Sequence, residues 1–299
     1  MKIGFLTGAL SEMPLDEIVR WAGRHGFAAL ELHCEAQEGG PVCLNGSLNV
    51  ASLDAARTES LQAVAKESGV TFSCLTRCVN MLDADEKVRQ ANHDLARRVL
   101  DAAVLLNVDV VSNFVGRDLT RTVEDNLPIF REVFEPLCSD AAARGVRVAI
   151  ENCPLVGGPA GDQLQNIAIT PAVWRQLFQA IPDLGLNFDP SHLYWMGVDY
   201  LAAVKEFSRN IYHVHLKDTE ILDAVLAEAG IFSRSPRWWR YRIPGFGKVD
   251  WPALLSALYE AGYNGTLSIE HEDPVFRGSL ERKQEGLVIG RKRIEPLLG

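Results

Sequence analysis

Two histidines and a lysine alternate at the end of an apolar run, in the segment IYHVHLKDTE (residues 211–220). If this run forms a β-strand, residues i and i+2 point to the same face. His213, His215 and Lys217 then share one face, and the apolar residues between them share the other. Imidazoles are common metal ligands and acid–base groups near neutral pH. The segment therefore predicts a strand whose polar face is either exposed or lines a polar cavity.

Three further segments end in acidic residues in a comparable way. They read VAIEN, LNFDPSH and LSIEHED, and the acids are Glu151, Asp189 and Glu270. In each segment the alternating apolar residues face one side, so that the acid points to the other side. Four successive strands would thus bring a carboxylate, a carboxylate, the imidazole of His215 and a carboxylate to one place.

Three carboxylates in one place need a compensating charge, because each raises the pKa of its neighbours. A divalent cation supplies that charge. Taken singly, each residue is as often an ion-pair partner or a core side chain, as we expect for His213. The combination on successive strands favours one divalent metal ion, bound by Glu151, Asp189, His215 and Glu270. This hard to borderline donor set suits manganese, magnesium or cobalt, and zinc also fits.

Short apolar runs alternate with longer amphipathic segments along the whole chain. The expected strands are 2–6, 28–33, 70–75, 108–114, 146–152, 184–189, 211–217 and 265–270. The expected helices are 14–26, 53–69, 85–107, 121–144, 170–181, 198–208, 250–262 and a last one from about residue 278. Such alternation implies a parallel sheet, and eight units fit a closed (β/α)8 TIM barrel. We predict an α/β protein with a single barrel domain over residues 1–299.

Two connections, residues 34–52 and 219–249, are longer than usual and follow strands on the predicted active face. Long loops in a compact domain are usually functional. The second is an insertion that contains SRSPRWWRYRIPGFGKVDW, in which Trp239 and Arg240 are expected to contact the substrate as part of a lid. An interface in a homo-oligomer explains the same residues equally well.

Composition limits the function classes. The chain is 47% hydrophobic and 23% charged, as is typical of a globular protein. Its net charge of −9 argues against a nucleic-acid partner or an anionic membrane. The N-terminus lacks the apolar core of a secretory signal, and no run approaches the ~18 apolar residues of a membrane span. The six cysteines form no CxxC pair, so we expect reduced thiols in a cytoplasmic protein.

The motifs IEN, NFDPSH, HVHLKD and SIEHED resemble those of the xylose-isomerase-like TIM-barrel superfamily, in particular its sugar isomerase, epimerase and inosose dehydratase branch. In the ketose 3-epimerases of this family, the residues that match the four predicted ligands hold one divalent metal, usually manganese. The residues that match Glu151 and Glu270 also exchange protons with the substrate, and the residue that matches His192 contacts substrate hydroxyls. The resemblance implies an enzyme that acts on a small-molecule sugar or polyol.

Two further residues are predicted to bind substrate. His33 lies in phase with Glu31 at the end of the second strand, where the pair either contacts substrate or fixes the barrel mouth. Lys217 either neutralises a carboxylate or alkoxide, or pairs with Asp218 or Glu272.

The leading hypothesis is a metal-dependent isomerase or epimerase that removes a proton next to a carbonyl through an enediolate. The alternative is a dehydratase or lyase that takes the same first step and then expels a β-substituent from a keto-inositol or 3-keto sugar. A DNA-repair endonuclease, from another branch of the superfamily, disagrees with the net charge of −9. A sugar-binding protein without turnover is the remaining hypothesis.

Overall fold

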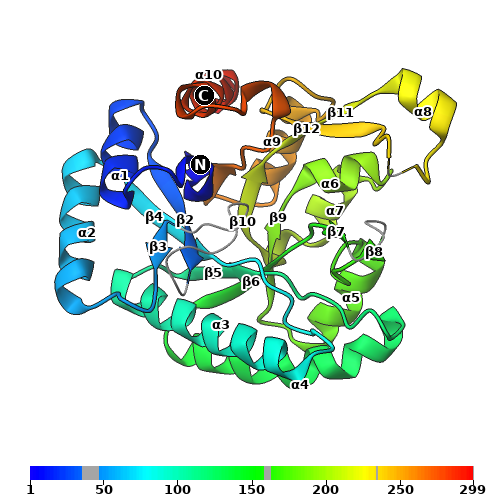
Figure 1. Ribbon diagram of the computed structural model, residues 1–299, viewed down its shortest axis with the longest axis horizontal. Helices are drawn as coiled ribbons and strands as arrows, with labels where there is room; N and C mark the ends of the chain where they lie inside the picture. The colour runs from blue at the N-terminus through cyan, green and yellow to red at the C-terminus, as the bar shows by residue number, and fades with distance from the viewer. Residues whose placement is uncertain (36–46, 158–162, 234, 299) are drawn as a thin grey trace.

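Eight parallel strands close into a barrel in the computed structural model, which describes residues 1–35, 47–157, 163–233 and 235–298 (Figure 1). β1 pairs with both β2 and β13, and Lys2 lies opposite Thr266, so the ring of strands is closed. The predicted (β/α)8 barrel is therefore confirmed. Its strands are β1 (Lys2–Leu6), β2 (Ala29–Glu35), β4 (Thr71–Thr76), β5 (Val110–Asn113), β6 (Arg147–Glu151), β9 (Gly185–Phe188), β10 (Ile211–Leu216) and β13 (Thr266–Ile269).

In the described residues, eight helices follow these strands at the predicted places. They are α1 (Leu15–Arg24), α2 (Ala55–Ser68), α3 (Glu86–Leu106), α4 (Val123–Ala143), α5 (Pro171–Ala180), α7 (Tyr200–Glu206), α9 (Trp251–Glu260) and α10 (Leu280–Ile294). Local sequence explains their ends. The Asp54 side chain caps α2 by accepting from the Arg57 amide, and Gly69 ends the helix with a left-handed φ of 68°.

Strand alternation divides the core from the barrel interior. Val148 and Ile150 of β6 lie in the large apolar core beneath the helices, whereas Ala149 belongs to a small cluster inside the barrel, with Cys74 and Val110. The next inward position after Ala149 is Glu151, at the carboxyl end of the strand. The same period-two pattern therefore delivers polar side chains to the mouth of the barrel.

The connections contain elements that periodicity did not predict. The short helix α6 (Pro190–Trp195) follows β9 directly, and the insertion 219–249 contains α8 (Asp223–Ala229) within an antiparallel hairpin of β11 (Asp218–Ile221) and β12 (Trp239–Arg242) (Figure 1). The remaining short pieces are the strands β3 (Leu48–Asn49), β7 (Val156–Gly157) and β8 (Gln163–Leu164), and the 3-10 helices η1 (Thr7–Leu10), η3 (Ser208–Asn210), η4 (Pro274–Phe276) and η5 (Glu295–Leu297).

Most of the predicted functional connection 34–52 lies outside the described residues, since residues 36–46, including Cys43, are not among them. The five cysteines in the described part are free thiols, as expected for those positions. In the same part of the chain, every helix is too short or too polar to span a bilayer.

Candidate active site

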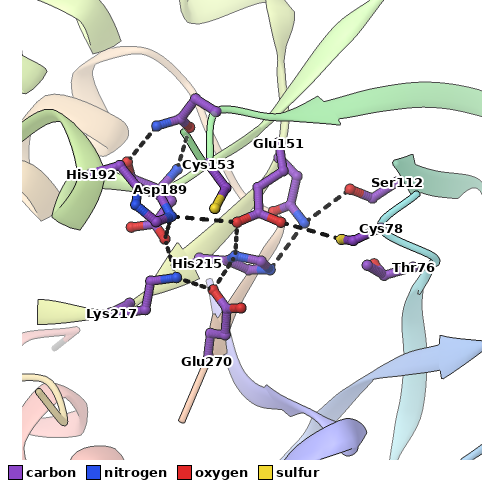
Figure 2. Close-up of polar contacts among 12 residues, drawn as sticks. Thr76, Cys78, Ser112, Glu151, Cys153, Asp189, His192, His215, Lys217 and Glu270 are labelled. Carbon is purple, nitrogen blue, oxygen red and sulfur yellow. Dashed lines mark hydrogen bonds and ion pairs between the residues drawn. The ribbon is translucent and has the colours of Figure 1, made fainter. Parts of the chain in front are cut away.

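Four side chains from successive strands meet at the carboxyl end of the barrel. Glu151 ends β6, Asp189 follows β9, His215 lies in β10 and Glu270 follows β13. One ligand atom from each lies within 4.8 Å of the others, and all four side chains are buried or nearly so. Figure 2 shows their polar ends turned toward one another. The structure thus brings together the four residues that the sequence predicts as metal ligands.

The group passes a test for a metal site, because buried donor atoms there make no hydrogen bond. The Oδ1 atom of Asp189 accepts from the Ser191 amide at 2.8 Å and caps α6, while Oδ2 has no hydrogen-bond partner. The Nδ1 atom of His215 is likewise buried without one. Asn152 holds Asp189 from behind, through bonds to its backbone N–H and C=O, each at 2.8 Å. Three carboxylates and an imidazole with free lone pairs fit a divalent cation.

A buried lysine supplies positive charge at the same place (Figure 2). The ammonium of Lys217 lies 3.0 Å from Asp189 Oδ2, 2.5 Å from Glu270 Oε2 and 3.2 Å from Glu272 Oε2. Burial lowers the pKa of Lys217, but these carboxylates outweigh burial and hold it well above its usual range. The sequence predicts that Lys217 either neutralises a carboxylate or alkoxide, or pairs with Asp218 or Glu272. In the structure it neutralises Asp189 and Glu270 and also pairs with Glu272.

The two glutamates differ in their electrostatic surroundings. Burial raises the pKa of Glu151, but the charge of His215 and the nearby imidazole of His192 outweigh burial and lower it to about 2. Burial raises the pKa of Glu270, and the nearby Glu151 charge adds to this despite the attraction of Lys217. The two carboxyl groups of one site are thus pushed apart in pKa, a pattern that often accompanies separate acid and base roles.

His192 connects the insertion to the mouth of the barrel, because it contacts both the acidic ligands and Tyr241 of the insertion. It lies in α6, and its Nε2 atom lies 3.1 Å from Asp189 Oδ2 and 3.7 Å from Glu151 Oε1. Its Nδ1 atom lies 2.8 Å from the hydroxyl of Tyr241 in β12, and the Tyr241 ring lies 4.7 Å from the Lys217 ammonium. Sequence reasoning missed Tyr241. The alternation within WRYR was the available signal, since it turns Trp239 and Tyr241 to one face and the arginines to the other.

The sequence predicts a lid or an interface at Trp239 and Arg240, and in the structure both side chains contact residues of this chain. Trp239 is only 1% exposed, and its ring stacks on Trp195 of α6 with centroids 4.0 Å apart. Arg240, on the opposite face of β12, pairs with Glu220 of β11 at 2.7 Å. Trp239 thus packs the β11–β12 hairpin against α6, and burial of its apolar ring stabilises this arrangement.

A second polar layer lies below the four ligands. Glu31 of β2 is fully buried; it accepts from Thr76 and from Asn187 Nδ2 at 3.0 Å, and lies 3.0 Å from His215 Nε2. His213 is buried beside Asn187 at 3.1 Å, and burial lowers its pKa to about 4, so it is a neutral core histidine below the site.

Of the predicted pair Glu31 and His33, Glu31 contacts the ligand group through His215. His33 is half-buried, and its ring packs against Gly8, where a Cβ would lie 2.8 Å from Nδ1. Two thiols also border the site. Cys78 Sγ lies 3.5 Å from Glu151 Oε2, and Cys153 forms a further cluster with Glu151 and His192.

Curated proteins similar in sequence to this chain include an uncharacterized protein and inosose dehydratases. An uncharacterized Bacillus subtilis (strain 168) protein, YfiH, is 27% identical over 309 residues, which cover 91% of this chain and 93% of that protein. An inosose dehydratase of Geobacillus thermodenitrificans (strain NG80-2) is 33% identical over 191 residues, which cover 60% of this chain and 61% of that enzyme. The dehydratase match thus spans less than two thirds of that protein.

Solved structures share the fold over nearly the whole length. D-psicose 3-epimerase with D-tagatose from Clostridium cellulolyticum H10 has a TM-score of 0.73 at 16% identity, covering 100% of this chain and 99% of that one. The IolI protein with a bound zinc atom has a TM-score of 0.70 at 20% identity, covering 99% and 96%. At these identities the likeness shows the fold alone.

The family itself follows from a direct match of the sequence. The model of the xylose isomerase-like TIM barrel family matches residues 19–291, which is more than half of the chain. An inosose dehydratase is among the proteins similar in sequence, and D-psicose 3-epimerase shares the fold. The chain belongs to the xylose isomerase-like TIM barrel family.

Proposed function

We propose that the chain is a divalent-metal-dependent isomerase or epimerase of a sugar or sugar derivative. The observation that carries the proposal is the convergence of Glu151, Asp189, His215 and Glu270, with buried lone pairs left without hydrogen bonds. These four residues would hold the ion; manganese is expected, and magnesium, cobalt and zinc suit the same donors. Bound there, the metal supplies Lewis-acid polarisation of a substrate carbonyl.

The two glutamates carry the proposed proton transfer. They come from β6 and β13, which are separated in the barrel by β9 and β10, so they approach a bound sugar from different sides. One removes a proton from the carbon next to the carbonyl, and the other returns a proton to the opposite face. His192 and Lys217 donate hydrogen bonds to substrate oxygens, and the buried setting keeps bulk water from the reacting carbon.

A dehydratase is the second candidate, and two observations favour it. The inosose dehydratase of G. thermodenitrificans is 33% identical over the part that aligns. β-Elimination also needs a proton donor for the departing hydroxyl, and His192 and Lys217 are two N–H donors beside the carboxylates. The mass of the product distinguishes the two reactions, since isomerisation leaves the mass unchanged and dehydration lowers it by one water.

The proposal is tested by turnover in D₂O with ketoses and keto-inositols, in the wild type and in Glu→Gln variants. Glu151→Gln and Glu270→Gln should each lose a factor of about 10²–10⁴ in kcat and retain metal, because the amide keeps an oxygen ligand but is no base. Glu272→Gln is the matched control, since Glu272 pairs with Lys217 outside the ligand group. The wild type should incorporate deuterium at the reacting carbon.

Two results would contradict this scheme. Turnover without deuterium uptake, together with a nearly active glutamine variant, would indicate a hydride shift instead of proton transfer. A wild-type protein that binds no divalent metal would remove the basis of the proposal.

A further inference from the structure

Glu31 contacts the ligand group from below without belonging to it. Its carboxylate comes from β2 and is fully buried. It accepts from the Thr76 hydroxyl and from Asn187 Nδ2 at 3.0 Å. The His215 Nε2 atom lies 3.0 Å from its Oε2 atom and 3.2 Å from its Oε1 atom. Glu31 therefore contacts the one imidazole of the ligand group on the side away from the other ligands.

The hydrogen-bond donors around Glu31 determine which nitrogen of His215 carries the proton. Asn187 Nδ2 lies within hydrogen-bond distance of Glu31 Oε1 (3.0 Å), Ser112 Oγ (3.2 Å) and His215 Nε2 (3.0 Å). An amide nitrogen has only two hydrogens, and the carboxylate and the hydroxyl oxygen take them. The contact between Glu31 and His215 then needs its proton from Nε2 of the imidazole.

This assignment leaves the lone pair of His215 on Nδ1. That atom is buried, makes no hydrogen bond, and lies 3.1 Å from Glu270 Oε2 and 3.6 Å from Glu151 Oε1. It therefore points into the ligand group. The hydrogen bond made by one ring nitrogen decides which nitrogen is available to a metal.

We propose that Glu31 is a positioning residue that holds the proton of His215 on Nε2, fixes the ring, and so presents Nδ1 to the metal ion. This inference rests on the metal site of the proposed function. It assigns to Glu31 a contribution to metal affinity rather than contact with the sugar, because Thr76, Asn187 and His215 already surround its carboxylate.

The first test is a Mn²⁺ titration against a competing chelator, with wild type, Glu31→Gln and Thr76→Val. Glutamine has nearly the same shape as glutamate, but its NH₂ group is a donor. It must face the Asn187 amide or the His215 N–H, which are also donors, so one hydrogen bond is lost. Loss of such an outer partner weakens metal binding by about 10–100-fold. Thr76→Val removes a donor to Glu31 without touching His215, and we expect a much smaller change.

The outcomes separate the two proposals. A wild type that binds no Mn²⁺ contradicts the proposed function itself. A wild type that binds Mn²⁺ together with an equally tight Glu31→Gln variant overturns only the role of Glu31, as does an equal weakening by Thr76→Val.

A second measurement needs no Glu31 variant and so covers the case in which the glutamine protein does not fold. In Zn²⁺-loaded wild type labelled with ¹⁵N at histidine, we expect His215 to show a protonated Nε2 and a metal-bound Nδ1. His215→Gln identifies the signals by their loss. Zinc bound through Nε2 would overturn the inference, because that nitrogen would have no proton to give Glu31.

Discussion

Two polar layers lie one above the other inside the barrel, and they differ in how completely they are hydrogen-bonded. In the lower layer (Glu31, Thr76, Ser112, Asn187 and His213), each side chain has a hydrogen-bond partner in the structure. In the upper layer (Glu151, Asp189, His192, His215, Lys217 and Glu270), Asp189 Oδ2, His192 Nε2 and His215 Nδ1 make none, although charged neighbours lie close.

Charged neighbours, rather than hydrogen bonds, surround these three atoms of the upper layer, so their lone pairs and protons remain available to a bound ion or substrate. The hydrogen bonds of the lower layer are complete in the protein alone. The lower layer specifies structure, and the upper layer is held ready for a ligand.

The largest expected effect compares the two histidines of β10. His215→Ala should abolish stoichiometric metal binding, a greater loss than the roughly 10–100-fold cost of an outer contact. His213→Ala should keep the metal but lower stability by about 1–3 kcal/mol, because Ser73 and Asn187 lose a buried partner. Metal analysis and urea unfolding measure the two effects. Full metal content in His215→Ala would remove the distinction between the layers.

The next effect concerns the charge held in the upper layer. Lys217→Met should destabilise the metal-free protein by about 3–5 kcal/mol, because buried carboxylates lose their cation. Added metal should restore much of the loss, since binding to the folded state stabilises it. Thermal unfolding with and without Mn²⁺ measures this, and Lys205→Met on the outer helix α7 is the control. An unchanged melting temperature of the metal-free variant would contradict the assigned role.

The smallest effect compares two neighbours on β12. Tyr241→Phe removes one hydrogen bond to His192, worth about 0.5–1.5 kcal/mol, so kcat/KM should fall roughly two- to tenfold with metal content unchanged. Arg240→Ala breaks a partly exposed ion pair with Glu220 and should cost only about 0.2–1 kcal/mol of stability, without a kinetic effect. A raised KM in Arg240→Ala would instead support the sugar contact predicted from the sequence.

The barrel and the four proposed ligands could be predicted because both follow from one period-two pattern. In VAIEN, for example, Val148 and Ile150 must face the helices, so Glu151 has only the interior left. Contacts made across strands or from outside the barrel were harder to predict. Nothing local in LELHCE says that Glu31 will reach His215, because that contact depends on how β2 and β10 face each other across the closed barrel.

The insertion was the least predictable part. Its composition pointed to Trp239 and Arg240 as part of a lid or of an interface, but could not reveal that Trp239 stacks on Trp195, in a short helix that periodicity could not detect. Because α6 was not predicted, neither the burial of Trp239 against Trp195 nor the contact of Tyr241 with His192 could be predicted.

Closure of the barrel by its first and last strands has a consequence for folding. Lys2 pairs with Thr266, so the ring cannot close until the chain has been synthesised through residue 266. Contacts so distant in sequence make folding slow, and partly made barrels expose strand edges to aggregation. Glu270 follows the closing strand, whereas Glu151 appears more than a hundred residues earlier. During synthesis, Glu151 is therefore present before Glu270. We expect tight metal binding only after the barrel has closed and all four ligands are in place.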